Sequence, residues 1–192
     1  MILQSFDVIT TNSSIEILSI DGDASGFLSF DCDDEEDRVR RALSLNTTLK
    51  DIRITTEYWL SDILDIVMVS PNLKALTMHR LEYEPPSIED ITDVVQLLLS
   101  NMKLQLLTIE GFQMDSGIAA AFAAAFQANQ TIKTLIMRHG AIKPIGAVSF
   151  VKALPHDHSL EAIVFDELAF EDDSSLNIVR MLCHTPLKVL SR

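Results

Sequence analysis

Apolar residues recur in one short pattern along this 192-residue chain. An apolar residue is followed by two others, a second apolar residue, one further residue and a third apolar residue. The six complete copies are Ile15-Leu18-Ile20, Leu49-Ile52-Ile54, Leu73-Leu76-Met78, Leu104-Leu107-Ile109, Ile132-Leu135-Met137 and Leu160-Ile163-Phe165, and Leu187-Leu190 is a partial seventh. Successive copies begin 34, 24, 31, 28, 28 and 27 residues apart. The alternating apolar positions predict a short strand in each copy, and the recurrence predicts a repeat architecture.

Helical patterns lie between these predicted strands. The sequence from Ser87 to Asp90 resembles a capping box, and Ile91, Val94 and Leu98 follow it at helical spacing. Residues 115–128 are mostly Ala and Phe, and such small residues let a helix lie close to a sheet. Further helices are predicted over residues 34–45, 58–69, 144–154 and 174–182. One strand and one helix per unit predict an α/β fold whose units stack on one another.

The predicted turns into three of the strands carry the same residue. Asn46, Asn101 and Asn129 each stand three positions before the first apolar residue of a copy. Asparagine tolerates the left-handed conformation in which many helices end. We therefore predict that these residues mark turns between a helix and the next strand.

The segments LKALTM (73–78), LQLLTI (104–109), IKTLIM (132–137) and LEAIVF (160–165) resemble the LxxLxL core of leucine-rich repeats. The length of the strand-helix unit is similar to that of the ribonuclease-inhibitor-like subclass, and the resemblance covers roughly residues 15–190. It implies a single domain: a right-handed superhelical solenoid of about six repeats over residues 15–192, with a concave parallel sheet and convex helices. Residues 1–14 would form a half repeat or an N-terminal cap.

The chain departs from the family at one position of the repeat. The family places Asn or Cys eight residues after the first Leu, where its side chain ties the turn that follows the strand. This chain has Asp23, Glu57, Leu81, Phe112, Gly140 and Leu168 there. The turns must therefore be held by packing or in another way.

The residues between the core positions are expected on the concave face, because side chains alternate along a strand. Stacked strands then form columns, in which Leu106, Ile136 and Val164 are expected to be exposed beside charged residues. An apolar strip edged by charges is typical of a protein-binding surface, although scattered apolar residues on a sheet need no special explanation. The candidate partner-binding residues are Thr77, His79, Leu106, Thr108, Glu110, Ile136, Arg138, Val164 and Asp166.

Charge narrows the class of partner. The chain has 28 acidic and 15 basic residues, which gives a formal net charge of −13. This charge repels phosphate backbones and anionic lipid headgroups, so we expect neither nucleic acid nor a membrane as partner. A protein with a basic or mixed apolar surface fits better.

Targeting and redox features favour an intracellular protein, in the cytoplasm or the nucleus. The N-terminus has no basic region typical of a signal peptide, and the apolar stretch 118–126 is much shorter than the roughly 20 residues that span a bilayer. The only two cysteines, Cys32 and Cys183, form no disulfide framework, which favours a reducing compartment.

Two segments carry residues that bind metals in other proteins. Residues 21–32 match a calcium loop at Asp21, Asp23 and Gly26, but Cys32 stands where a bidentate Glu is required. The competing interpretation is an acidic loop before a helix whose N-terminus favours Asp and Glu.

A second set of candidate ligands comes from two loops, one in each of two successive units. These loops could together provide a tetrahedral zinc site if the units stack closely. Its residues are His156, His158, Cys183 and His184, at matching places in two units. Polar turn residues at the edge of the repeats are the competing and favoured interpretation, so we expect no metal and no cofactor.

Catalytic signatures are absent from the sequence. There is no GxSxG, GxxxxGK[ST] or HExxH motif, and an ion pair is the simplest role for the neighbours His79 and Glu110. We therefore expect a non-enzymatic protein–protein interaction module that uses the concave face. One alternative is a regulator of a small GTPase, since Ran GTPase-activating proteins share the fold that this chain resembles. A metal-binding structural or sensor protein is another.

The end of the sequence raises three alternatives. The segment LKVLSR stops within an expected strand. Because an uncapped repeat exposes its core and a sheet edge, we expect that the last strand is a sufficient lid, that the chain belongs to a longer array, or that another molecule covers this end.

Overall fold

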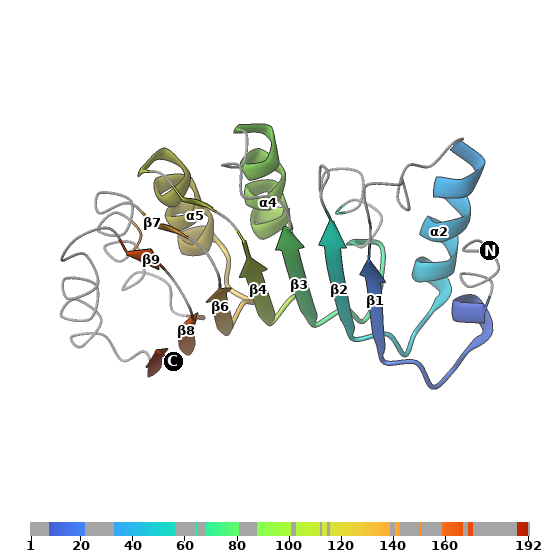
Figure 1. Cartoon of the computed structure of the whole chain (residues 1–192). Helices are drawn as coiled ribbons and strands as arrows, with labels where there is room; N and C mark the ends of the chain where they lie inside the picture. The colour runs from blue at the N-terminus through green and yellow to red at the C-terminus, as the bar shows by residue number, and fades with distance from the viewer. Residues whose placement is uncertain are drawn as a thin grey trace.

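Seven short strands form one parallel sheet in the computed structural model, and their order in the sheet is their order in the chain (Figure 1). Each strand lies on one copy of the apolar pattern. The strands are β1 (Ile17–Asp21), β2 (Asp51–Thr56), β3 (Ala75–Arg80), β4 (Leu106–Glu110), β6 (Thr134–Arg138), β8 (Ala162–Asp166) and β10 (Lys188–Ser191). The structure describes residues 8–21, 33–56, 64, 68–80, 88–100, 103–111, 113–114, 116–138, 141–142, 150, 159–166, 169–170 and 188–191.

Equivalent positions of the apolar pattern lie opposite one another from β1 to β8. The partial copy Leu187-Leu190 is an exception: Val189 pairs with Ile163, and Leu190 pairs with Val164, one position from the register that the pattern predicts. Ile52 of β2 pairs with Leu76 of β3, and Leu107 of β4 pairs with Leu135 of β6. This register is favoured because a shift by one residue would turn each apolar set to the opposite face of the sheet. From β1 to β8 the sequence pattern therefore determines both which residues form the strands and how the strands align.

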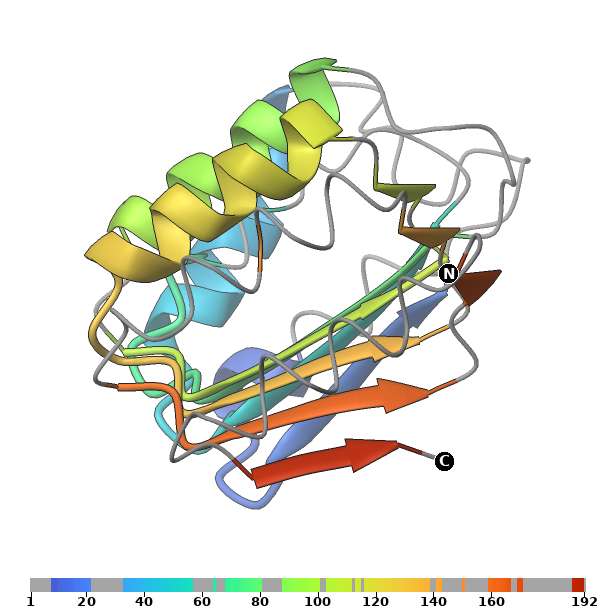
Figure 2. The same ribbon diagram turned by 90° about the vertical axis from the view of Figure 1, so that its left-hand side faces the viewer.

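The described helices cover one face of this sheet, as Figure 2 shows. They are α2 (Asp33–Leu45), α4 (Ile88–Ser100) and α5 (Ser116–Ala128). Leu43, Leu98 and Phe122, one from each helix, are at most 1% exposed and join the apolar strand residues in one core. No described element covers the opposite face of the sheet in Figure 2. We call this the open face.

Three of the predicted helices are confirmed, those around residues 34–45, 88–100 and 115–128. Within 58–69 and 144–154 the structure describes the helical residues Leu64, Met68 and Phe150, together with Val69 in a turn. The predicted helix over residues 174–182 lies outside the described part of the chain. The α/β class and the open parallel sheet are thus established.

A second, smaller sheet was not predicted from the sequence. Its strands β5 (Gln113–Met114), β7 (Ala141–Ile142) and β9 (Ala169–Phe170) are parallel and follow β4, β6 and β8 along the chain. Gly111 has a φ of 78° at the turn between β4 and β5, a conformation that glycine adopts without a steric penalty. Strands of two residues carry too few positions for an alternating pattern to be recognised in the sequence.

Buried asparagines hold the turns that lead into two of the strands. Asn129 is 1% exposed. Its Nδ2 donates to the carbonyl of Leu98 at 2.6 Å, and its Oδ1 accepts from the backbone N–H groups of Thr131 and Ile132, both at 2.9 Å. The side chain therefore joins the turn of its own unit to the end of α4 in the preceding unit.

Asn46 repeats this arrangement after α2. It is 2% exposed, donates to the carbonyl of Ile9 at 2.7 Å and accepts from the N–H groups of Thr48 and Leu49. The two asparagines thus hold their turns through side-chain hydrogen bonds, which were not predicted from the sequence. Asn101 lies outside the described residues, as do the six positions where the family carries Asn or Cys after the strand.

Candidate functional site

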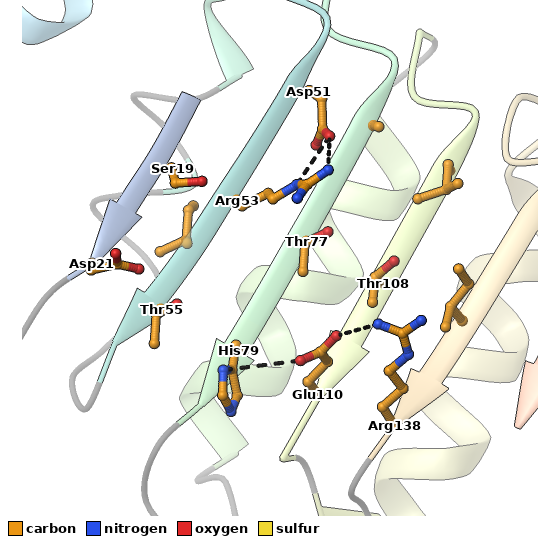
Figure 3. Close-up of a pocket in the computed structure, with 14 residues that line it drawn as sticks. Ser19, Asp21, Asp51, Arg53, Thr55, Thr77, His79, Thr108, Glu110 and Arg138 are labelled. Atoms are coloured by element: carbon orange, nitrogen blue, oxygen red, sulfur yellow. Dashed lines mark hydrogen bonds and ion pairs between the residues drawn. The ribbon is translucent and has the colours of Figure 1, made fainter. Parts of the chain in front are cut away.

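A hollow of about 480 Å³ lies on the open face, across the strands from β1 to β6 (Figure 3). With one exception, its lining residues alternate with the core positions of the strands, as the period of a strand requires. Backbone pairing aligns them in columns, one of which runs through Thr55, His79, Glu110 and Arg138. The columns expected from the sequence are therefore present on this face.

Small side chains form the centre of the hollow. Ala75, Thr77 and Thr108 lie on the central strands β3 and β4, and Thr77 is paired directly with Thr108. Thr108 is 3% exposed, so it shapes the hollow but offers almost no surface to a partner. Thr108 is one of the candidate contact residues predicted from the sequence, and its neighbours enclose most of its surface.

An ion pair within strand β2 bounds one side of the hollow. Arg53 donates to the same carboxylate oxygen of Asp51 from Nε at 3.1 Å and from Nη2 at 2.9 Å. The two residues are two positions apart on the strand, which places both on the open face. The other carboxylate oxygen, Oδ1 of Asp51, is buried and has no hydrogen-bond donor among the described residues.

A second charged group spans three strands on the other side of the hollow. Glu110 of β4 accepts a hydrogen bond from Nη1 of Arg138 on β6 at 3.1 Å. Its second oxygen lies 3.9 Å from Nδ1 of His79 on β3 (Figure 3). The side chain of Glu110 is only 14% exposed, so its charge is held between the two neighbours. The ion-pair interpretation of His79 and Glu110 agrees with this geometry, and Arg138 is an additional partner.

The apolar residues of the open face are less exposed than expected. Leu106, Ile136 and Val164 are half-buried. Ile136, for example, lies between Thr108 and Val164 at the paired positions of the two neighbouring strands. Among the apolar residues that the structure describes on the open face, Ile17 on β1 is exposed, with 54% of its surface accessible. The expected strip of exposed apolar residues is therefore a partly covered strip.

Seven of the nine candidate residues line the hollow. The other two candidates lie on the next strand, where the backbone of Val164 pairs with Ile136 and that of Asp166 with Arg138. The lining also includes Ser19, Asp21, Asp51, Arg53 and Thr55, which were not among the candidates predicted from the sequence. The same alternation in the first two units was the signal that could have included them.

Apart from Asp21, the metal-site candidates lie outside the described part of the chain. His156, His158, Cys183 and His184 lie outside the described residues, as do residues 22–32 of the calcium-loop-like segment. Within the described ranges, no group of three or more His, Cys, Asp or Glu residues is arranged to hold a metal ion. No helix in the same ranges is long and apolar enough to cross a membrane.

Comparison with known proteins identifies similar folds and no family. No protein-family model matches the sequence, and no curated protein is significantly similar to it. The structure resembles a crystal structure of a protein from Bacteroides fragilis, with a TM-score of 0.55 and 13% identity over 96% of this chain and 68% of that one. This likeness concerns the fold alone.

A second similar structure is the actin-binding site 2 of leiomodin-1. It superposes with a TM-score of 0.48 and 21% identity over 56% of this chain. The match covers 64% of the leiomodin-1 chain, which is less than two thirds of its length.

Proposed function

We propose that this chain is a protein-interaction module that binds a partner protein through its open face, without catalysis. In this proposal the strand-helix units form a leucine-rich-repeat solenoid of about six repeats, of the ribonuclease-inhibitor-like subclass, and the open face is its concave surface. Stacked repeats of this kind use their extended concave surfaces for binding.

The hollow on the open face is the observation that carries the proposal. It combines ion-paired side chains, hydroxyl groups and half-buried apolar residues on a surface that no described element covers. The two ion-paired groups hold Asp51, Arg53, Glu110 and Arg138 in defined positions before a partner arrives. Such preorganisation lowers the entropy cost of association, which favours a binding role.

The charged residues of the hollow favour binding over catalysis. Arg53 pairs with Asp51, and Glu110 lies between Arg138 and His79, so these charges are matched within the chain. The net charge of −13 favours a partner with a basic or mixed apolar surface. The cysteine content further favours an intracellular setting.

Affinity capture with matched variants tests the proposal. The full chain, Ile136→Asp and Leu99→Asp are each immobilised and exposed to a cell extract, and captured proteins are identified by mass spectrometry. Leu99→Asp is the control, because it makes the same change at a 44% exposed position of α4. A captured protein is then purified, and its affinity for all three chains is measured by calorimetry.

The proposal predicts that Ile136→Asp weakens binding by about 30-fold or more, as expected for the loss of an apolar contact that becomes buried in an interface. Leu99→Asp should bind within about twofold of the unmodified chain. Equal affinity for all three folded chains would contradict binding at the open face. Circular dichroism confirms folding before the comparison.

A further inference from the structure

The hollow has different chemistry at its two ends, and we infer that the partner segment has a matching polarity. The partner segment places a Lys or Arg side chain against strands β1 and β2 and an apolar side chain against strands β4 and β6. The inference rests on the proposed function and adds the chemical class and the orientation of the ligand. Four observations support it.

Carboxylates are in excess at the β1–β2 end. Asp21 is exposed and makes no ion pair with any residue that the structure describes. Oδ1 of Asp51 likewise lacks a donor within the described ranges, while Arg53 directs both Nε and Nη2 to Oδ2 of the same carboxylate. Arg53 is therefore used by Asp51, and the exposed carboxylate of Asp21, beside Thr55 on the next strand, would be complemented by a Lys or Arg side chain of the ligand.

The charges at the β4–β6 end are more closely matched. Both oxygens of Glu110 face side-chain nitrogens within the chain, Nη1 of Arg138 at 3.1 Å and Nδ1 of His79 at 3.9 Å. Leu106 and Ile136 lie beside this group on the same two strands and are half-buried. Their remaining surface can be buried by an apolar side chain with no unmatched charge to desolvate nearby.

The spacing of the strands sets the length of the segment. Asp21 and Ile136 lie on strands that are four steps apart in the sheet, or about 19 Å at roughly 4.8 Å per step. An extended chain covers this distance in about six residues. The basic and apolar side chains of an extended ligand are thus about five to seven residues apart.

The small residues at the centre leave room between the two ends. Ala75 and Thr77 lie on β3, between the β2 ion pair and the apolar residues of β4 and β6. A peptide backbone can cross the hollow there without meeting a long side chain. The net charge of −13 also attracts a basic ligand over longer distances than the contacts themselves.

Selection from a peptide library tests the inference directly. The full chain is immobilised and a phage-displayed library of random dodecapeptides is selected on it. We expect enriched peptides to contain a Lys or Arg and an apolar residue about five to seven positions apart. One such peptide is synthesised, and its affinity is measured by fluorescence anisotropy against the unmodified chain and four variants.

Two variants alter the ends of the hollow and two are matched controls. Asp21→Lys should weaken peptide binding by about 5- to 10-fold, and Ile136→Asp by about 30-fold. Glu16→Lys carries the same charge change at an exposed residue that pairs with Lys50 outside the hollow, and Leu99→Asp carries the same polarity change on α4. Both controls should stay within about twofold. A peptide with its basic residue changed to Glu should bind Asp21→Lys better than the unmodified chain.

The outcomes separate the inference from the proposed function. Selected peptides without basic residues, or peptides that are weakened by Ile136→Asp and not by Asp21→Lys, would overturn the inferred polarity and leave the open face as the binding surface. Peptides that bind the unmodified chain and all four variants equally would contradict both the inferred polarity and the open face as the binding surface. Failure to enrich any peptide would overturn the inference, which requires a short linear ligand.

Discussion

At the scale of single residues, the buried asparagines contribute to stability more than their positions in turns suggest. Asn129 satisfies one backbone carbonyl and two backbone N–H groups that are otherwise enclosed by the protein. Buried polar groups that lose their only partner each cost about 1–3 kcal/mol. The residue therefore connects two units through hydrogen bonds that water cannot replace.

Replacement of this residue gives the first prediction. Asn129→Ala is expected to lower the free energy of unfolding by about 2–4 kcal/mol, because it leaves several buried backbone groups unpaired. Gln130→Ala is the control, since Gln130 is exposed and adjacent. Urea denaturation followed by circular dichroism measures both. A loss below about 0.5 kcal/mol for Asn129→Ala would show that the turn holds without these bonds.

The pairing of Glu110 with Arg138 gives the second prediction. A double-mutant cycle with Glu110→Gln and Arg138→Met should give a coupling energy of about 0.5–1.5 kcal/mol, because Glu110 is largely shielded from water while Arg138 is 40% exposed. The coupling should fall as salt is raised from low to high concentration, since the exposed partner is screened. Additive effects of the two substitutions would show that the pair contributes nothing to stability.

At the scale of elements, the Ala-rich helix α5 depends on which of its alanines face the core. Ala119 and Ala123 are buried on the same face as Phe122 and Phe126, whereas Ala120 and Ala124 are exposed. The ring of Phe126 meets that of Phe150 edge to face, with centroids 6.2 Å apart. Small residues beside these rings leave no room for larger side chains.

Two substitutions in this helix give the third prediction. Ala123→Leu should lower the free energy of unfolding by about 1–3 kcal/mol, because three added carbon atoms overpack a filled core. Ala124→Leu adds the same atoms on the exposed side and should change stability by less than about 0.5 kcal/mol. Thermal and urea denaturation measure both. Equal losses would mean that helix composition, and not packing, determines the effect.

The same elements show what the sequence could and could not predict. The strands were predictable because each core triplet, such as Leu104-Leu107-Ile109, is strongly apolar and recurs. Register followed from the same pattern, so Glu110 was expected beside His79. The pairing of Arg53 with Asp51 depends on rotamers, which an alternating pattern does not determine. The half-burial of Ile136 depends on side chains of neighbouring strands, so single-strand reasoning overestimated its exposure.

At the scale of the whole molecule, the chain order of the strands means that most contacts join neighbouring units. Strands β3, β4 and β6 each have a paired strand on both sides, whereas among the described strands β1 pairs with β2 alone and β10 with β8 alone. In such an arrangement stability is approximately a sum of unit and nearest-neighbour terms. Opening from an end breaks one interface, and opening of a central unit breaks two.

The fourth prediction is that hydrogen exchange differs between the end strands and the central strands. Backbone amides of β3, β4 and β6 should exchange most slowly, and those of β1 and β10 fastest, when native exchange is followed by mass spectrometry. Ala123→Leu should accelerate exchange in α5 and in the adjoining β4 and β6, with little change in β1, because its strain passes mainly to neighbouring units. Equal protection of all seven strands, lost uniformly in the variant, would instead identify one fully cooperative unit, in which an end strand is as stable as a central one.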